Sequence, residues 1–178
     1  MRRLSTALAL ALLFAGAAVA QAPSPERYAG RYRFDGSDED GRRRVQRALA
    51  PTLRRLHSVL RALAERRLND SVPVARRIDI GLDGEEIAIR YVGEDDRTFR
   101  SRAGRPRAIE GLDGREARMT QLFRDGHLEQ VFEGERGRMY NVFELSRDGR
   151  RLTLTVVMTG ERLEEPIRIT LPYVRVGD

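Results

Sequence analysis

Four Asp-Gly pairs constrain the fold of this chain more than any other feature. They stand at 83–84, 113–114, 125–126 and 148–149, and segments of alternating apolar and polar residues flank them. An Asp-Gly pair between alternating segments is a strong signal for a β-hairpin, and a two-residue turn keeps the apolar residues of both strands on one face. The clearest example is YNVFELSRDGRRLTLTVVMTG, residues 140–160. Most of the chain is therefore predicted to be an antiparallel meander.

The alternation predicts about ten strands that share one apolar face. The opposite face carries mainly charged residues and threonine. A meander of this kind buries its apolar face by closing into a barrel or by curling around a helix. We therefore expect a mainly β protein, a meander barrel with strands at 28–34, 75–82, 85–92, 97–102, 105–110, 115–123, 128–134, 138–146, 151–159 and 166–175.

A helical segment separates the first predicted strand from the others. Ser37 is followed by three acids, a pattern that favours a helix N-terminus. Because Pro51 interrupts the segment, we expect a kinked helix or two abutting helices, which either fill the barrel or cover its mouth. Between Gly41 and Leu68, apolar residues three or four apart form one stripe: Val45, Leu49, Leu53, Leu56, Leu60 and Leu63.

The apolar face of the predicted barrel is expected to point inward. A barrel of the outer-membrane type turns its apolar face to lipid, encloses a polar lumen and carries aromatic girdles. Here the strands are short, the polar face is densely charged and such girdles are missing. The pattern therefore favours a barrel with an apolar interior.

Residues 1–20, MRRLSTALALALLFAGAAVA, have the pattern of a secretory signal. Two arginines precede a short apolar run, and Ala18-Val19-Ala20 offers a small-residue cleavage site. We expect a periplasmic or secreted protein that is cut after Ala20, with a flexible lead at 21–26 and one barrel domain at 27–176. The chain contains no cysteine, so its stability has to come from packing rather than from disulfides.

All 33 basic residues are arginine, and the formal net charge is +6. The arginines are interspersed with 27 acids, whereas nucleic-acid binding favours a concentrated basic patch, so we do not expect nucleic acid as a partner. The helical segment is the one locally basic region. It either docks on an anionic envelope surface or forms an ordinary solvated face. The arginines concerned are Arg42, Arg43, Arg44, Arg47, Arg54 and Arg55.

The order of the elements resembles that of the fatty-acid-binding proteins of the calycin superfamily, which also includes the lipocalins. A strand, a helical segment and nine further meandering strands follow one another in both. The opening YAGRY, with Gly30 and Tyr32, is similar to the family's Gly-x-Trp strand. Arg175 stands where a calycin's terminal basic residue covers the first-strand aromatic. The resemblance spans residues 28–175 and implies a β-barrel that binds a ligand.

One part of the family's pattern is missing from this sequence. Fatty-acid-binding proteins commonly hold the ligand carboxylate with an arginine two residues before a tyrosine of the last strand. Tyr173 matches the tyrosine, but Leu171 stands in place of the arginine, and Arg168 lies on the opposite face by parity. The resemblance therefore supports the fold but not a buried carboxylate clamp.

Three amide side chains interrupt the predicted apolar face. Gln121, Gln130 and Asn141 share the parity of their apolar neighbours, and short turns at 125–126 and 135–136 place them opposite one another. They either orient a ligand in an apolar cavity, or bond to each other, to buried water or to the helix. The predicted pocket wall comprises Ile89, Tyr91, Met119, Gln121, Gln130, Asn141, Phe143, Val156 and Tyr173.

No motif in the sequence indicates catalysis or metal binding. Gly-x-Ser-x-Gly, His-Glu-x-x-His and phosphate-loop patterns do not occur, and two histidines without cysteine make a poor metal site. We therefore expect a protein that is not an enzyme, needs no cofactor and binds a small apolar or amphipathic, lipid-like ligand. The alternative is a cell-envelope interaction or structural protein with a fully packed barrel, which acts through its arginine-rich surface.

Overall fold

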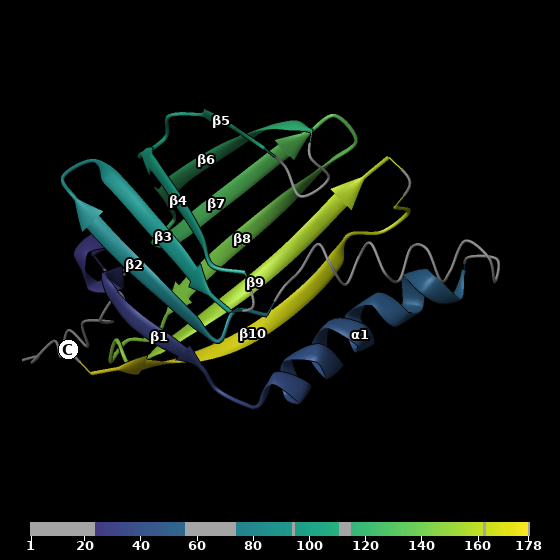
Figure 1. The fold of residues 1–178 in the computed structure, drawn as a ribbon, viewed down its shortest axis with the longest axis horizontal. Helices are drawn as coiled ribbons and strands as arrows, with labels where there is room; N and C mark the ends of the chain where they lie inside the picture. The colour runs from purple at the N-terminus through teal and green to yellow at the C-terminus, as the bar shows by residue number, and fades with distance from the viewer. Residues whose placement is uncertain (1–23, 56–73, 94, 111–114, 162, 178) are drawn as a thin grey trace, which may run out of the picture.

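The computed structural model describes residues 24–55, 74–93, 95–110, 115–161 and 163–177, and they form one curved antiparallel sheet and two helices. The strand order is β4-β3-β2-β1-β10-β9-β8-β7-β6-β5, and the sheet curves into a nearly closed barrel (Figure 1). The strands are β1 (Gly30–Phe34), β2 (Arg77–Asp83), β3 (Glu86–Val92), β4 (Arg97–Arg102), β5 (Arg107–Glu110), β6 (Glu116–Arg124), β7 (His127–Gly134), β8 (Gly137–Leu145), β9 (Arg151–Gly160) and β10 (Ile167–Val176).

The predicted fold class is confirmed, and no strand boundary differs from the prediction by more than two residues. The start of the first strand differs because Pro25–Tyr28 form a short 3-10 helix, η1, where a flexible lead and the first strand residue were expected. Proline at its first turn favours a helical start. The buried Tyr28 side chain, whose hydroxyl donates to the Gly126 carbonyl at 2.8 Å, fixes the segment. The predicted signal at 1–20 lies outside the described residues.

The three Asp-Gly pairs that the structure describes form turns of different lengths. Asp125 and Gly126 are themselves the two turn residues, and both have positive φ, 50° and 79°. At the first pair the turn residues are 84–85, and the last pair lies in the longer loop 147–150. Each loop holds an even number of residues, which is why the predicted apolar sets still share one face.

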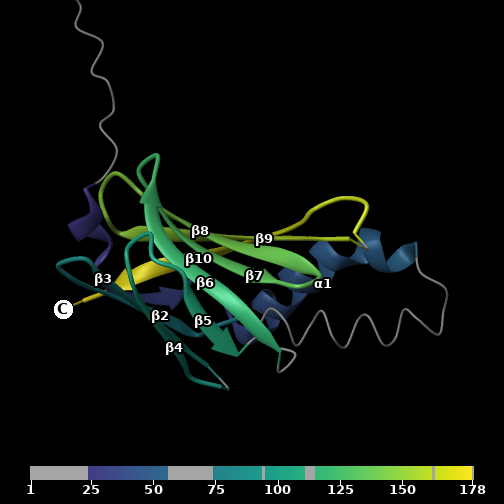
Figure 2. The same ribbon diagram turned by 90° about the horizontal axis from the view of Figure 1, so that it is seen from above.

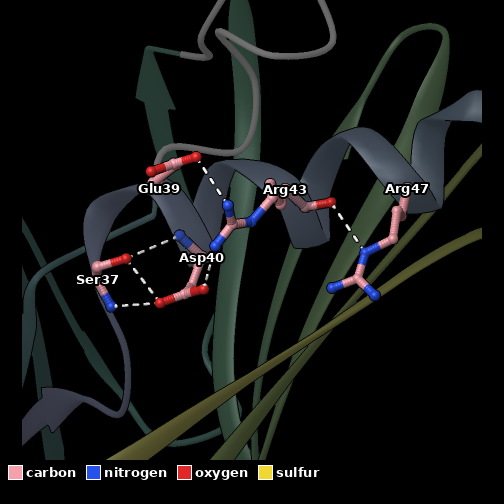
Figure 3. A network of polar contacts seen from close by, with 5 residues as sticks. All are labelled: Ser37, Glu39, Asp40, Arg43 and Arg47. Carbon is pink, nitrogen blue, oxygen red and sulfur yellow. Dashed lines mark hydrogen bonds and ion pairs between the residues drawn. The ribbon is translucent and has the colours of Figure 1, made fainter.

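Helix α1 (Asp38–Arg54) begins with a capping box, as the Ser37 pattern predicts (Figure 3). The Asp40 amide donates to Ser37 Oγ at 3.1 Å, and the Ser37 amide donates to Asp40 Oδ2 at 2.9 Å. Arg43 pairs with Glu39 and Asp40. The Ser37 hydrogen bonds, and then Arg43, hold the pKa of the Asp40 carboxyl well below its usual range. The stability that these Asp40 contacts contribute is therefore fully present at pH values above the ordinary pKa of the carboxyl. It is lost as the pH falls through the lowered pKa of Asp40.

Helix α1 lies along the first half of β10, on the side where β1 no longer pairs with it (Figures 1 and 2). Its buried stripe, Val45, Leu49 and Leu53, belongs to the same core as the inward-facing residues of β10. The helix thus completes the wall of the barrel beside β10. Pro51 lies in its last turn, and the predicted continuation to Leu68 is outside the described residues.

The inward parity predicted for the strands agrees with the observed burial. Apolar side chains from β1, β2, β3, β7, β8, β9 and β10 form one core together with η1 and α1. Neither helix in the described ranges has the length and the hydrophobicity needed to cross a bilayer.

Arg175 closes one end of the barrel. Its guanidinium carbon lies 4.8 Å from the centroid of the Tyr32 ring, and the group donates to the Tyr32 hydroxyl and to the Ala29 and Gly149 carbonyls, the latter two at 2.8 Å. Gly30 has φ 149°, and a Cβ there would collide with this guanidinium. The arrangement expected from the resemblance, a terminal basic residue over the first-strand aromatic, is confirmed.

Candidate functional site

The three amides form a row across neighbouring strands. Gln121 on β6 is opposite Gln130 on β7, which is opposite Asn141 on β8. Val156 on β9 continues the row. The two glutamines are 0 % exposed and Asn141 is 6 % exposed. The predicted register is confirmed, and the three side chains together are called the amide row below.

Apolar residues border the amide row on both sides. The register places one apolar row toward each end of the barrel. The residues on one side are Met119, Phe132, Met139 and Met158, and those on the other side are Phe123, Leu128, Phe143 and Leu154. The wall is therefore a narrow polar band between two apolar surfaces, which matches the polarity of an amphipathic molecule.

Side chains from the opposite wall reach across the interior to the amide row. The Tyr91 hydroxyl on β3 donates to Gln130 Oε1 at 2.6 Å, and Asn141 Nδ2 donates to this hydroxyl at 3.0 Å. Ser101 Oγ on β4 donates to Gln121 Oε1 at 2.9 Å. Burial raises the pKa of the Tyr91 phenol, so it stays protonated and keeps its donor role at physiological pH.

The two walls meet through side chains rather than through a strand ladder. Within the described ranges, β4 and β5 are the two ends of the sheet, and β4 pairs only with β3. The Phe99 ring on β4 packs edge-on against Phe132 and Tyr91, with centroids 5.2 and 6.0 Å apart. One backbone bond, from Gly104 to the Gln121 carbonyl, joins the turn after β4 to β6. Among the described residues, the contact between these two walls is therefore made by side chains and one backbone bond, and not by a ladder.

Three buried polar atoms of the amide row have no hydrogen-bond partner among the residues that the structure describes. They are Gln121 Nε2, Gln130 Nε2 and Asn141 Oδ1. The amides are partly satisfied by one another, since Asn141 Nδ2 also donates to Gln130 Oε1 at 3.2 Å. Leaving a buried donor or acceptor without a partner costs about 1–3 kcal/mol per group. The row therefore presents two donors and one acceptor that are open to a further group.

The structure places the residues of the predicted pocket wall on the inner face of the sheet. Ile89, Met119, Phe143 and Val156 face inward beside the amide row or Tyr91, and the first three are fully buried. Tyr173 is engaged by other contacts, since its hydroxyl donates to the Ala75 carbonyl and its ring packs on Phe34. Its role in a pocket wall stays a prediction.

Sequence reasoning missed two residues of this site, Phe99 and Ser101. Both lie in the predicted strand 97–102, and both face inward opposite Ile89 and Ile87. Their alternation with Thr98 and Arg100 was the available signal. It was weak because only one of the two inward residues is apolar.

The described residues form shallow hollows at the surface of the protein. One lies between α1 and β10 and has a volume of about 240 Å³. Three arginines, Arg44, Arg47 and Arg168, line it together with Ala48, Ile169 and Thr170. Two others of the predicted basic surface are engaged elsewhere, since Arg43 pairs with Glu39 and Asp40, and Arg55 pairs with Glu164 and Glu165.

Solved structures of similar architecture match 85–86% of this chain. Lipid binding protein 8 of Caenorhabditis elegans, in its apo form, is 13% identical, with a TM-score of 0.56 over 86% of this chain and 98% of that chain. The Echinococcus granulosus fatty-acid-binding protein 1 is 14% identical, with a TM-score of 0.56 over 85% and 99%. The Schistosoma mansoni fatty acid binding protein in complex with arachidonic acid is 12% identical, with a TM-score of 0.53 over 85% and 97%.

The protein has a calycin-like β-barrel fold. No protein-family model matches the sequence, and no curated protein sequence matches it. At 12–14% identity, these structures show the fold of this calycin-like barrel but do not identify its ligand.

Proposed function

We propose that this calycin-like barrel binds a small amphipathic, lipid-like molecule in its interior and performs no chemistry on it. The observation that carries the proposal is the set of three unpartnered polar atoms in the amide row, set between two apolar rows. Ligand sites typically combine an apolar lining with a few polar groups that fix orientation. The similar structures named above are of proteins named for lipid or fatty-acid binding, which supports the same class of ligand.

The ligand gains its space where the two walls meet through the Phe99 ring. Its polar group takes the open hydrogen bonds of the amide row, and its apolar part replaces the contacts that Phe99 makes with Phe132 and Tyr91. The bonds from Tyr91 to Gln130 and from Ser101 to Gln121 are kept, so the open atoms of the row remain two donors and one acceptor. Ligand binding therefore exchanges the ring contacts of Phe99 for ligand contacts and leaves the strand ladders intact.

Replacing both glutamines, Gln121→Leu with Gln130→Leu, is expected to weaken ligand binding by roughly tenfold or more while the fold survives. The leucines keep the volume of the wall but remove the open donors. The measurement is titration with a fluorescent long-chain alcohol, together with thermal unfolding. Thr120→Leu, on the outward face of β6, is the matched control and should bind as the wild type does.

Unchanged binding by the double variant with an altered unfolding midpoint would make the amides structural and contradict the proposal. Native mass spectrometry on the protein from its own host complements the titration. We expect a reproducible extra mass that solvent extracts as one compound. We also infer export, supported by the signal pattern of residues 1–20, and the same spectrum should show a chain that begins at Gln21.

A second candidate function is docking on anionic lipid at the hollow between α1 and β10. Its three arginines approach from two elements, with Ala48 and Ile169 as an apolar floor, and no acid is among the described residues that line it. Such a combination suits a phosphate-bearing head group with its acyl boundary. In this reading the packed interior is only a scaffold, and the surface carries the function.

The double replacement Arg44→Ala with Arg168→Ala is expected to lower binding to vesicles that contain anionic lipid by about thirtyfold, since each arginine near such a surface contributes about 1 kcal/mol. The measurement is cosedimentation with anionic and with neutral vesicles. Arg33→Ala with Arg102→Ala removes the same charge from β1 and β4 and serves as the control. An equal loss of vesicle binding in the two double variants would show that only net charge matters, and it would contradict a site at the hollow.

A further inference from the structure

We propose that the ligand of the amide row carries an uncharged hydroxyl head group, and that the barrel discriminates against an ionised carboxylate on the same apolar chain. The inference rests on the proposed interior ligand and specifies its chemistry. It follows from the kinds of atoms left open in the row, from the charges around them and from the apolar rows on either side.

The open atoms match the bonding capacity of a hydroxyl. A hydroxyl has one donor hydrogen and two acceptor lone pairs. Gln121 Nε2 and Gln130 Nε2 are donors, and Asn141 Oδ1 is an acceptor. Because the three residues are directly opposite one another on adjacent strands, their side chains can converge on one oxygen. One alcohol oxygen would satisfy all three atoms.

An ionised carboxylate fits the same atoms poorly. It has only acceptors, so Asn141 Oδ1 would face negative oxygen without a hydrogen between them. A buried carboxylate also needs a cation or several donors to offset the loss of its hydration. Leu171, 1 % exposed, stands on the inner face of β10 and supplies no charge. The row therefore lacks what an anion requires.

Two arginines among the described residues share the inward register near the row, and neither reaches into the buried interior. Arg97 is opposite Tyr91 at the start of β4, and Arg107 is opposite Met119 on β5. Both are exposed, and Arg107 donates to the Arg100 carbonyl at 2.9 Å. A carboxylate drawn to Arg97 would sit at the rim and leave the amide row open. Replacing Arg97 therefore distinguishes a ligand whose head group lies at the rim from a ligand whose head group lies at the amide row.

The test compares tetradecanol with tetradecanoate, which share a chain length, at about pH 8, where a free carboxylic acid is ionised. Binding is measured by calorimetry, and the side-chain NH₂ signals of the glutamines are followed by NMR. We expect the alcohol to bind roughly tenfold tighter than the anion, with shifts of the Gln121 and Gln130 signals. Asn141→Leu should narrow this ratio, because it removes the acceptor that repels the anion.

The control Arg97→Ala is expected to leave the ratio and the amide shifts unchanged. Tighter binding of tetradecanoate, lost in Arg97→Ala, would overturn the hydroxyl assignment while the interior ligand of the proposed function stands. Alcohol binding without shifts of the glutamine signals, or an unchanged ratio in Asn141→Leu, would also overturn it. Absence of binding by both compounds, at concentrations that saturate a comparison fatty-acid-binding protein, would overturn the proposed function itself.

Discussion

Replacing Arg175 with alanine is expected to lower the free energy of unfolding by about 3–5 kcal/mol, the largest effect of any single replacement considered for this barrel. The guanidinium stacks on the Tyr32 ring and donates to the Tyr32 hydroxyl and to the Ala29 and Gly149 carbonyls. Alanine leaves these acceptors without their donor in a half-buried place. A hydrogen bond from a charged donor contributes about 1.5–3 kcal/mol and the stacking about 1 kcal/mol, but in the alanine variant water takes over part of the hydrogen bonding at this half-buried place.

The effect should appear in urea unfolding as a lower midpoint with an unchanged slope. Arg175→Lys is expected to lie between alanine and the wild type, because an ammonium keeps the charge but cannot donate to three acceptors in one plane. Arg168→Ala, on the exposed face of the same strand, is the matched control and should change stability by less than about 0.5 kcal/mol. Equal effects of Arg175→Ala and Arg168→Ala would show that the contacts of Arg175 with Tyr32, Ala29 and Gly149 do not stabilise the fold.

Leu49→Ala is expected to cost about 2–5 kcal/mol of unfolding free energy, the usual range for a buried leucine whose removal leaves a cavity. Leu49 is 0 % exposed and lies at the centre of the α1 stripe that joins the core beside β10. The result tests whether α1 is part of the same cooperative unit as the barrel. Thermal and urea unfolding measure the change in unfolding free energy. The control has to keep the helix propensity of α1, so a replacement by glycine is not suitable.

Arg44→Ala, on the solvent side of α1, is a better control for Leu49→Ala, since alanine preserves helix propensity and removes no buried surface. We expect a change of less than about 0.5 kcal/mol there. A similarly small change in Leu49→Ala would mean that the helix can detach without loss of the barrel. The apolar stripe of α1 would then pack against the barrel without contributing to its stability.

The wall that bears the amide row could be predicted almost completely from the sequence. The inward parity of Gln121, Gln130 and Asn141 follows from alternation, and their opposition follows from the short turns at 125–126 and 135–136. Both are local properties, because a turn of known length sets the register of the two strands beside it. The same reasoning gives the inward parity of Tyr173 but not its distance along β10 from the row, which is several residues.

The pairing across the barrel could not be predicted in this way. Tyr91 and Gln130 are 39 positions apart, Ser101 and Gln121 are 20 apart, and no hairpin joins their strands. Which residues of two walls meet depends on the curvature and closure of the whole sheet. Alternation along a strand carries no information about this.

The sequence by itself therefore determined the elements of this protein: ten strands with their inner and outer faces, the cap and stripe of α1, and the order in which neighbouring strands pair. Only the tertiary structure decided that α1 completes the wall beside β10, that Tyr91 and Ser101 reach across to the amide row, and that two donors and one acceptor of this row remain open. The physical reason is one of range. Alternation, capping and turn geometry act between residues a few positions apart, whereas hydrogen-bond satisfaction in a closed barrel depends on side chains that only the complete fold brings together.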